Sequence, residues 1–397
     1  MEAFWETIKA FFASSGIAGF FAEGGYLNLI MIAVACLLLF LAIKKKFEPY
    51  LLLPIAFGML LVNLPFVGKE IFNKTVDAEG VTHYEGIFGF LYYGVKWGIY
   101  PCLIFLCIGA TTDFGPLIAN KKTMLLGAAA QLGIFITFIG AIAIGKNGLG
   151  WTNFDAKIAS SIGIIGGADG PTAILVTSKL APEYLSSIAI VAYSYMALVP
   201  VIQPPIIRLL TTKKERLIKM ETPREVSKTE KILFPIIVTI VTVLIVPSAG
   251  ALIGCLMLGN LIKESGVVPQ ITETLSKTLM YIVTILLGIC VGCTADAATF
   301  LTLDTILIFV LGILAFSIAT ASGVLGGKLM CFFTKGKVNP MIGAAGVSAV
   351  PMAARVVHKE GVKEDPTNFL LMHAMGPNVA GVIGSAVAAG VLLLLFL

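Results

Sequence analysis

The sequence predicts an all-α polytopic membrane protein made of two inverted repeats, each with a broken or re-entrant helix. Three observations support this fold class. Of the 397 residues, 57 % are hydrophobic and only 13 % are charged, with a mean hydropathy of +0.95, whereas soluble domains carry about 25 % charged residues. Apolar runs long enough to cross a bilayer recur along the chain. One apolar segment in each half is interrupted by glycine and proline.

The chain divides into four predicted parts. Residues 1–25 are expected to form an N-terminal interfacial helix, because Glu2 to Phe21 combines aromatic with polar residues and lacks the basic start of a signal peptide. The first membrane repeat covers residues 26–210, with spans expected at about 27–43, 49–66, 98–115, 122–145 and 184–210. A basic connector, residues 211–231, leads to the second repeat, residues 232–397, with spans at about 232–248, 250–263, 278–294, 303–333 and 367–397.

The first broken segment runs from Ile158 to Lys179 and contains Gly166-Gly-Ala-Asp169-Gly-Pro171 at its centre. Glycine disfavours helix, and proline lacks the amide donor that a continuing helix needs. The proline suits the start of a new half-helix, with Asp169-Gly170 as its cap. Non-helical backbone at membrane depth requires surrounding protein or water. An ionisable residue in such a place is a functional-site hypothesis.

The second half contains a matching broken segment, Val338 to Val357. Two motifs also recur there in the same order. Cys107-Ile-Gly-Ala-Thr-Thr-Asp113 recurs as Cys290-Val-Gly-Cys-Thr-Ala-Asp296, and Gly163-x-x-Gly166 with Pro171-x-Ala173 recurs as Gly343-x-x-Gly346 with Pro351-x-Ala353. Each half has about five predicted spans. An odd number of spans starts the second half on the opposite side of the membrane, so the two halves should have inverted topology. Inverted repeats with broken helices that meet near the midplane are an architecture of secondary transporters.

The distribution of charge predicts the topology. With the N-terminus outside, most of the 28 Lys and Arg residues fall on the cytoplasmic side, and the long loop from Phe66 to Val95 lies outside. The net charge of +5 is therefore explained by topology and does not indicate a nucleic-acid partner. The basic connector is interpreted as a topological signal, with a binding role as the alternative. The expected location is the cytoplasmic (inner) membrane, as a multi-pass protein.

Side chains with oxygen atoms cluster around the two breaks in the sequence, and no Cys or His accompanies them. They are Asp169, Thr172, Tyr195 and Gln203 in the first half, and Ser348, Asn378 and Ser385 in the second. This set favours a hard cation such as Na⁺ over zinc or copper. Backbone carbonyls freed at the breaks could complete the shell. The seven cysteines form no recognisable disulfide framework, and Cys290-x-x-Cys293 has no second pair of metal ligands nearby in the sequence.

Each candidate also has a purely structural interpretation. Asp169 could only cap a helix, although a cap does not require a charge at membrane depth. Tyr195 could pack with its hydroxyl satisfied, and Asn378 could cap the last helix. Ser385 could permit close helix packing between Gly384 and Ala386. Gln203 and Ser348 are the weaker candidates for ion contact.

Several of these motifs resemble one known family, the β subunits of sodium-pumping, biotin-dependent decarboxylases. The family includes oxaloacetate, methylmalonyl-CoA, glutaconyl-CoA and malonate decarboxylases, and the resemblance covers nearly the whole chain from about residue 26. It is carried by Gly166-Gly-Ala-Asp169-Gly-Pro-Thr-Ala-Ile174, Tyr193-Ser-Tyr195-Met-Ala-Leu-Val-Pro200 with Gln203-Pro-Pro205, Ser348-Ala-Val-Pro-Met-Ala-Ala-Arg355, Gly376-Pro-Asn378-Val-Ala-Gly381 and Gly384-Ser385-Ala.

The resemblance implies that the chain decarboxylates carboxybiotin, delivered on a biotin carrier protein or domain, and exports Na⁺. The family's functional aspartate, tyrosine, asparagine and serine match Asp169, Tyr195, Asn378 and Ser385. The resemblance also implies a carboxyltransferase α subunit and a small membrane-anchoring γ or δ subunit as partners. It implies a homotrimer of β subunits and an elevator-type, transporter-like movement. The acyl substrate belongs to the partner transferase and is not encoded in this chain.

We therefore expect a carboxybiotin decarboxylase that couples CO₂ release to Na⁺ export and consumes a proton. Asp169 and Tyr195 are the expected catalytic residues, and the cofactors are Na⁺ and a biotin carried by the partner. The alternative is a secondary Na⁺/H⁺ or Na⁺/carboxylate transporter without an enzymatic step. Genes for a biotin carrier and a carboxyltransferase beside this one would favour the decarboxylase. A channel is less favoured, because broken helices at a repeat interface suggest alternating access.

Overall fold

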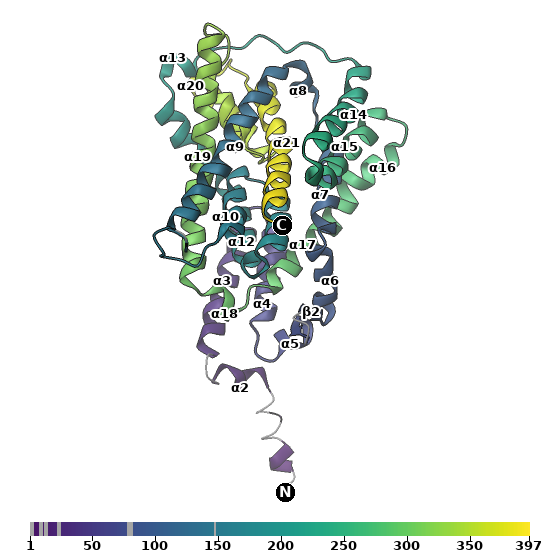
Figure 1. Ribbon diagram of the computed structural model, residues 1–397, viewed down its shortest axis with the longest axis vertical. Coiled ribbons are helices and arrows are strands. Elements are labelled where there is room, and N and C mark those ends of the chain that lie inside the picture. The colour runs from purple at the N-terminus through teal and green to yellow at the C-terminus, as the bar shows by residue number, and fades with distance from the viewer. Residues whose placement is uncertain (1–3, 8–10, 12–14, 22–24, 78–81, 147) are drawn as a thin grey trace.

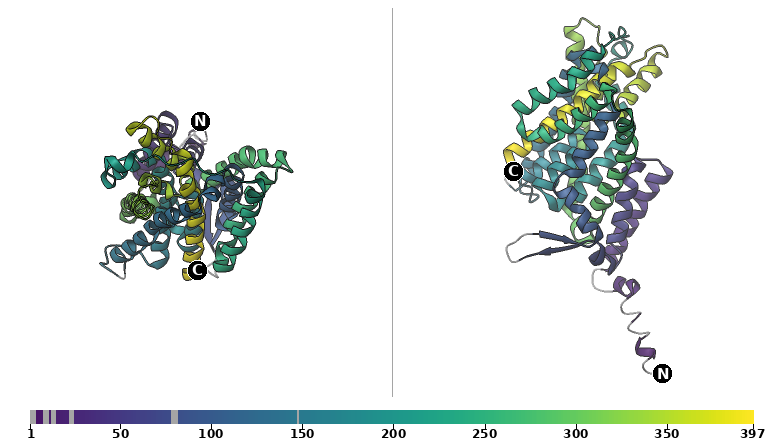
Figure 2. Two further views of the ribbon diagram at one scale, coloured as in Figure 1. Left: turned by 90° about the horizontal axis from the view of Figure 1, so that it is seen from above. Right: turned by 90° about the vertical axis from the view of Figure 1, so that its right-hand side faces the viewer.

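The computed structural model describes residues 4–7, 11, 15–21, 25–77, 82–146 and 148–397. Helices and the loops between them make up the described chain, with one short antiparallel hairpin, β1–β2, in which Asn73 lies opposite Glu85. The predicted interfacial helix, Glu2 to Phe21, lies partly outside the described residues, and α2 is the short helix within it. The body is elongated, with the N-terminus at one end, and the hairpin projects near that end (Figures 1 and 2).

The elements of the first half precede the connector. They are α2 (Gly16–Phe20), α3 (Gly25–Lys44), α4 (Pro49–Val62), α5 (Val67–Ile71), β1 (Asn73–Val76), β2 (Thr82–Glu85), α6 (Ile87–Lys96), α7 (Ile99–Thr111), α8 (Gly115–Ala119), η1 (Lys121–Thr123), α9 (Met124–Ile144), α10 (Ala156–Gly163), η2 (Ile164–Gly167), α11 (Gly170–Leu180), η3 (Pro182–Tyr184) and α12 (Leu185–Leu210).

The connector and the second half follow. They contain α13 (Lys213–Arg216), α14 (Lys228–Ile245), η4 (Pro247–Ala249), α15 (Gly250–Ser265), α16 (Pro269–Glu273), the π-helical turn η5 (Thr274–Leu279), α17 (Met280–Cys293), α18 (Ala297–Phe300), α19 (Leu303–Phe333), η6 (Pro340–Gly346), α20 (Met352–Glu364) and α21 (Leu371–Phe396).

A helix lies at each of the ten predicted spans, but not every helix is long and apolar enough to cross a bilayer alone. Among the described residues, 5 helices meet that test, and up to 7 spans result if the bent pairs α6–α7 and α12 are each counted as one. The other three are α4, with 14 residues, α14, with 18, and α15, with 16. At 1.5 Å per residue, α4 covers only about 21 Å of a hydrocarbon core that is about 30 Å thick.

The segment predicted as a long loop between Phe66 and Val95 contains α5, the hairpin and α6. Helix α6 meets α7 at a bend of 64°. The ring of Tyr84 packs against that of Tyr92, with 4.5 Å between centroids. The ammonium of Lys96 lies 5.2 Å from the centroid of the Tyr84 ring and donates a hydrogen bond to the Thr82 carbonyl. These contacts fasten the hairpin to α6.

Helix α12 bends by 63° between Met196 and Leu198. Pro200 explains the bend, because it cannot donate a hydrogen bond to the residue four positions earlier and its ring clashes with that carbonyl. The bend separates the part of α12 that carries Tyr195 from the part that carries Gln203.

Two pairs of helices cross closely, and each pair joins one helix of the first half to one of the second. Helix α7 packs along α15, and α4 packs along α17. A Cβ added to Gly109 or to Gly259 would collide with a backbone carbonyl of the other helix, and the same holds for Gly58 and Gly292. Glycine at all four positions lets the helix backbones touch, as small residues do in membrane interfaces.

The centre of the molecule is built from α9 and α19, which also come from different halves and pack along each other. Helix α21 packs on α9, and α12 packs on α19. The broken segments α10–η2–α11 and η6–α20 lie between these helices, and most of their residues are buried. Long helices therefore surround both breaks with protein, as membrane depth requires.

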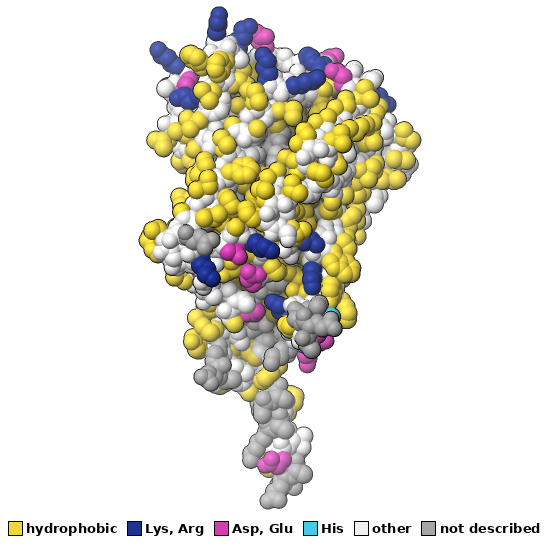
Figure 3. All heavy atoms as spheres, in the orientation of Figure 1, with side chains coloured by type: hydrophobic (Ala, Val, Ile, Leu, Met, Phe, Trp, Pro, Cys, Tyr) yellow, Lys and Arg dark blue, Asp and Glu magenta, His cyan; other side chains and the backbone are white. Residues whose placement is uncertain are grey.

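The surface is divided into charged ends and an apolar band. Lys and Arg gather at the end that carries α13, α20 and the connector, and hydrophobic side chains cover the region next to it (Figure 3). Exposed large hydrophobic residues of the chain include Leu244, Leu329 and Phe332. The connector and the N-terminus lie at opposite ends of the molecule (Figure 1). An exposed apolar band of this extent is expected of a protein surrounded by lipid.

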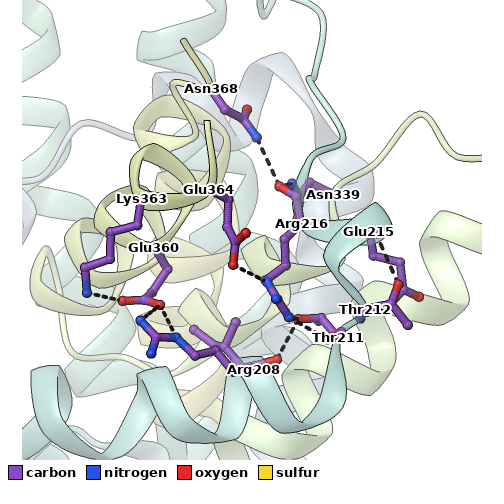
Figure 4. Close-up of polar contacts among 11 residues, drawn as sticks. Arg208, Thr211, Thr212, Glu215, Arg216, Asn339, Glu360, Lys363, Glu364 and Asn368 are labelled. Carbon is purple, nitrogen blue, oxygen red and sulfur yellow. Dashed lines mark hydrogen bonds and ion pairs between the residues drawn. The ribbon is translucent and has the colours of Figure 1, made fainter. Parts of the chain in front are cut away.

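A cluster of ion pairs fastens the end of α12 and α13 to α20 (Figure 4). The Glu360 carboxylate, which is 3 % exposed, accepts hydrogen bonds from Arg208 Nε at 2.8 Å and from Lys363 Nζ at 2.6 Å. Arg216 pairs with Glu364 at 2.8 Å. Burial works against ionisation of Glu360, but the two cations outweigh it and lower the pKa of this carboxyl.

We predict that Glu360→Gln lowers the free energy of unfolding by about 1–3 kcal/mol, the scale of a hydrogen bond to a charged group. Because the pKa of Glu360 is lower in the folded state, its contribution is complete above the pKa of about 4.3 of an unfolded glutamate and is lost as the pH falls below it. Thermal unfolding of the purified protein between pH 6 and pH 3 should therefore show a smaller loss of stability in the variant.

The matched control for Glu360→Gln is Glu273→Gln. Glu273 pairs with Lys277 at 2.9 Å, but both side chains are about two-thirds exposed. This control should change stability little at any pH. Equal effects of the two substitutions would show that the ion pairs of Glu360 stabilise the protein no more than the exposed pair of Glu273 does.

Candidate functional site

The first break lies between η2 and α11. Ala168 adopts a left-handed conformation, with φ 56° and ψ 42°, and ends the incoming helix. Asp169 is the N-cap of α11, and its Oδ1 accepts a hydrogen bond from the Thr172 amide at 3.4 Å. Pro171 is the second residue of α11, where its missing amide costs nothing. The predicted break, cap and half-helix are therefore confirmed.

The second break follows η6, and it meets the first break directly. The backbone leaves η6 at Val347 in an extended conformation and becomes helical again at Met352. The amide of Ser348 donates a hydrogen bond to the Gly167 carbonyl at 2.9 Å. This bond joins the two broken segments, which are far apart in the sequence.

A second link between the halves is made by Asp169 itself. Its Oδ2 accepts a hydrogen bond from the Ser385 hydroxyl of α21 at 2.7 Å. Asp169 is 6 % exposed, and within the described part of the chain no Lys, Arg or His forms an ion pair with it. A buried carboxylate without a cationic partner is unfavourable, so it requires either a bound cation or a proton.

Buried side-chain amides satisfy the carbonyls of the second break. Gln203 Nε2 donates to the Ala344 carbonyl at 2.9 Å. Asn378 Nδ2 donates to the carbonyls of Ala345 and Val347 at 3.0 and 2.7 Å. These carbonyls, which we expected to be free for a cation, therefore already hold α12 and α21 against the break. Each keeps a second lone pair.

The same amides leave their oxygen atoms without partners. Asn378 and Gln203 are fully buried, and neither amide oxygen accepts a hydrogen bond. The Ser348 hydroxyl is also buried and without a partner, whereas the Thr172 side chain interacts with the Asp169 carboxylate. Three of the predicted residues, Gln203, Ser348 and Asn378, thus present unsatisfied oxygen atoms around the two breaks. Each such oxygen costs about 1–3 kcal/mol unless a ligand satisfies it.

The chemistry of this set suits a monovalent hard cation. Asp169 supplies one negative charge, and the other candidate ligands are neutral oxygens. Over the described ranges, no group of three or more His, Cys, Asp or Glu residues could hold a metal ion. A divalent or soft metal would be expected to have such a group.

Tyr195 is not brought to Asp169. Its hydroxyl donates to the Phe309 carbonyl of α19, and its ring packs against Gly312. Tyr193, two residues earlier, lies closer to the first break, because a Cβ added to Gly170 would collide with its ring. The Tyr193 hydroxyl is buried without a partner. The sequence showed both tyrosines in one motif, but it did not indicate which one faces the break.

Sequence reasoning also missed Gln131, in the middle of α9. Its side chain is 5 % exposed, and its amide oxygen has no partner. A glutamine within the otherwise apolar stretch 124–144 was the available signal.

A cavity of ≈ 390 Å³ opens beside Asp169. Its wall includes Ser348 from the second break and Thr111 to Asp113 at the end of α7. Asp113 lies 3.8 Å from Lys231 of α14 and precedes α8, at the end of the molecule that the connector crosses (Figure 1). The cavity thus extends from the buried carboxylate toward the connector end.

Comparison with known proteins gives consistent matches along nearly the whole chain. A family model described as the Na⁺-transporting oxaloacetate decarboxylase beta subunit matches residues 27–396. The methylmalonyl-CoA decarboxylase subunit beta of Propionigenium modestum is 56 % identical over 98 % of this chain and 99 % of the relative. The glutaconyl-CoA decarboxylase subunit beta of Acidaminococcus fermentans is 52 % identical over 99 % and 98 %. The oxaloacetate decarboxylase beta chain of Klebsiella pneumoniae is 49 % identical over 92 % and 94 %.

We predict that Na⁺ raises the midpoint of thermal unfolding of the purified protein, compared with K⁺ at equal ionic strength. A ligand at 100 times its Kd stabilises the folded state by about 2.7 kcal/mol. Asp169→Asn should remove most of this shift. In K⁺ the variant should be at least as stable as the parent, because the amide removes an unpaired buried charge.

Asp296→Asn is the matched control for Asp169→Asn, because Asp296 also caps a helix, α18, away from the breaks. It should keep the full Na⁺ shift. A full shift in Asp169→Asn would mean that the cation binds elsewhere.

Proposed function

The chain belongs to the family of β subunits of Na⁺-transporting, biotin-dependent decarboxylases, and we propose that it releases CO₂ from carboxybiotin and exports Na⁺. The observation that carries this proposal is the buried Asp169 carboxylate, held by Ser385 and without a cationic partner among the described residues. Such a group can exchange a cation for a proton as its surroundings change.

The proposed chemistry balances with one proton. The bond between the biotin ureido nitrogen and the carboxylate carbon breaks, CO₂ leaves, and the electron pair stays on nitrogen. The nitrogen then takes up a proton, which we propose reaches the cavity by way of Asp169. Tyr195 remains a candidate for this relay, although its hydroxyl would have to leave the Phe309 carbonyl. Export of one Na⁺ against 100 mV costs roughly 2.3 kcal/mol.

Carboxybiotin is proposed to arrive on a partner carrier protein and to enter the cavity beside Asp169 from the connector end. The extension of the cavity toward Asp113 and α14 supports this direction of entry. The other proposed partners are a carboxyltransferase α subunit, a small anchoring γ or δ subunit and two further copies of this chain. The names of the relatives identify them as subunits or chains of decarboxylases, which supports an assembly of this kind.

An inverted repeat is supported by the exchange of packing partners between the halves. Helix α7 packs on α15 as α17 packs on α4, and α12 packs on α19 as α21 packs on α9. Helix α11 contacts α21 as α20 contacts α12. A two-fold axis in the membrane plane would relate each pair to its counterpart. We propose an elevator-type movement of the part that holds both breaks against the α4–α17 and α7–α15 pairs.

The proposed topology places the N-terminus outside and the connector in the cytoplasm, in the inner membrane of a bacterial cell. The position of the connector and the N-terminus at opposite ends supports it (Figure 1). The gathering of Lys and Arg at the connector end agrees with the positive-inside bias (Figure 3).

The test of the function is decarboxylation of carboxybiotin by the protein with its partners, as a function of Na⁺ concentration. Asp169→Asn should abolish Na⁺-stimulated turnover, because an amide supplies neither charge nor a titratable proton. Ser385→Ala should raise the Na⁺ concentration for half-maximal rate roughly tenfold, the effect of about 1.4 kcal/mol. Na⁺ transport without any decarboxylation would favour a plain secondary transporter.

The topology is tested by single cysteines in a protein whose exposed Cys36 is replaced by serine. Cysteines at Lys214 in α13 and at Lys335 after α19 should react with an impermeant maleimide only from the cytoplasmic side. A cysteine at Lys74 in β1 should react only from outside. All three positions are exposed. The same sidedness for Lys74 and Lys214 would contradict both the topology and the inverted repeat.

A further inference from the structure

We infer that Gln131 of α9 is a further ligand of the transported cation, because it contacts both halves of the site and lies near Ser385, the hydrogen-bond partner of Asp169. The inference deepens the proposed function and rests on it. Helix α9 belongs to neither broken segment, yet it packs against η2, η6 and α21 together. Gln131 therefore lies on a helix that contacts all three parts of the site.

The orientation of the Gln131 amide is fixed by its surroundings. The NH₂ group donates to the Gly381 carbonyl of α21 at 3.2 Å and approaches the Gly346 carbonyl of η6 at 3.5 Å. Both neighbours are acceptors, so the nitrogen must face them, and the oxygen must point the other way. That oxygen, Oε1, is buried and has no hydrogen-bond partner.

The direction of Oε1 is given by Gly167. A Cβ added to this glycine would lie 3.2 Å from Ile134 Cδ1 and 3.3 Å from both Gln131 Oε1 and the Cβ of Ser385, so these side chains pack tightly around it. The hydroxyl of Ser385 binds Asp169, and the Gly167 carbonyl accepts from Ser348. The absence of a side chain at Gly167 thus allows Gln131 Oε1 and Ser385, which binds Asp169, to pack closely against the same point of the first break.

A cation bound by Gln131 Oε1 and the Asp169 carboxylate would satisfy Oε1 and counter the charge of Asp169 at once. A buried amide oxygen without a partner is costly, and Na⁺ is bound by amide and carboxylate oxygens. Gln131 would then connect cation binding to the second break, because its NH₂ group holds carbonyls of η6 and α21 while its oxygen contacts the ion.

The first test replaces Gln131 with methionine, which is similar in length but lacks the amide oxygen. Gln131→Met should raise the Na⁺ concentration for half-maximal decarboxylation about tenfold, with the maximal rate recovered at high Na⁺. It should reduce the Na⁺-dependent shift in thermal unfolding as well. Thr137→Val removes another buried, unpaired oxygen from the same helix and should change neither readout.

A second test adds charge in place of removing oxygen. Gln131→Glu should make the half-saturating Na⁺ concentration depend more strongly on pH. Two neighbouring carboxylates hold a proton more tightly, and protons then compete with Na⁺. Lowering the pH from 8 to 6 should raise its half-saturating Na⁺ concentration more than in the parent. A role limited to packing would give the same pH response as the parent.

Gly167→Ala keeps the proposal testable if the glutamine variants fail to fold. A methyl group there would press on Gln131 Oε1, Ser385 and Ile134 and should weaken Na⁺ binding more than tenfold. The outcomes separate the two proposals. If the parent shows no Na⁺ dependence, the proposed function fails. If the parent depends on Na⁺ but Gln131→Met and Gly167→Ala respond as the parent does, only the role of Gln131 is overturned.

Discussion

The hydrogen bond from the Ser348 amide to the Gly167 carbonyl is the contact on which the site depends. It joins two helix breaks that each expose backbone polar groups inside an apolar protein. Neither break could stay buried alone, because unpaired peptide groups are costly without water. Their meeting lets one break satisfy part of the other. The place where they meet is also where a carboxylate, Asp169, is held away from solvent.

Side-chain amides complete what the backbone cannot supply. Gln203, Asn378 and Gln131 direct their NH₂ groups to consecutive carbonyls of the second break or to α21, and their oxygens remain unsatisfied. The arrangement separates two tasks within each amide. The nitrogen stabilises the irregular backbone, and the oxygen is left for a ligand. The unsatisfied oxygens and the unpaired carboxylate together make the protein without a cation less stable than it could be, a cost often found at functional sites.

The rest of the fold supports this centre from two directions. Glycine crossings such as that of Gly109 and Gly259 bring helices of the two halves into backbone contact. At the connector end, ion pairs fasten α20 to α12 and α13, so the second broken segment is tied to the end of the first half (Figure 4). The cavity beside Asp169 runs toward this same end. The Lys and Arg residues and the ion pairs of α20 therefore lie at the end of the molecule toward which the cavity runs.

Sequence alone determined the features that depend on local chemistry. Hydropathy located the helices, and glycine and proline located both breaks, because these residues act on their own backbone. The motifs around Asp169 and in the second half indicated the family, which the comparisons confirm. Sequence did not reveal the structure within the 66–95 segment, the shortness of α4, or which of Tyr193 and Tyr195 faces the break. It also missed Gln131, and it did not show that side-chain amides bind the carbonyls of the second break. The contacts of Gln131 and of the second break depend largely on packing between residues far apart in the sequence, such as Gln203 with Ala344. Only the tertiary structure decides which distant groups meet.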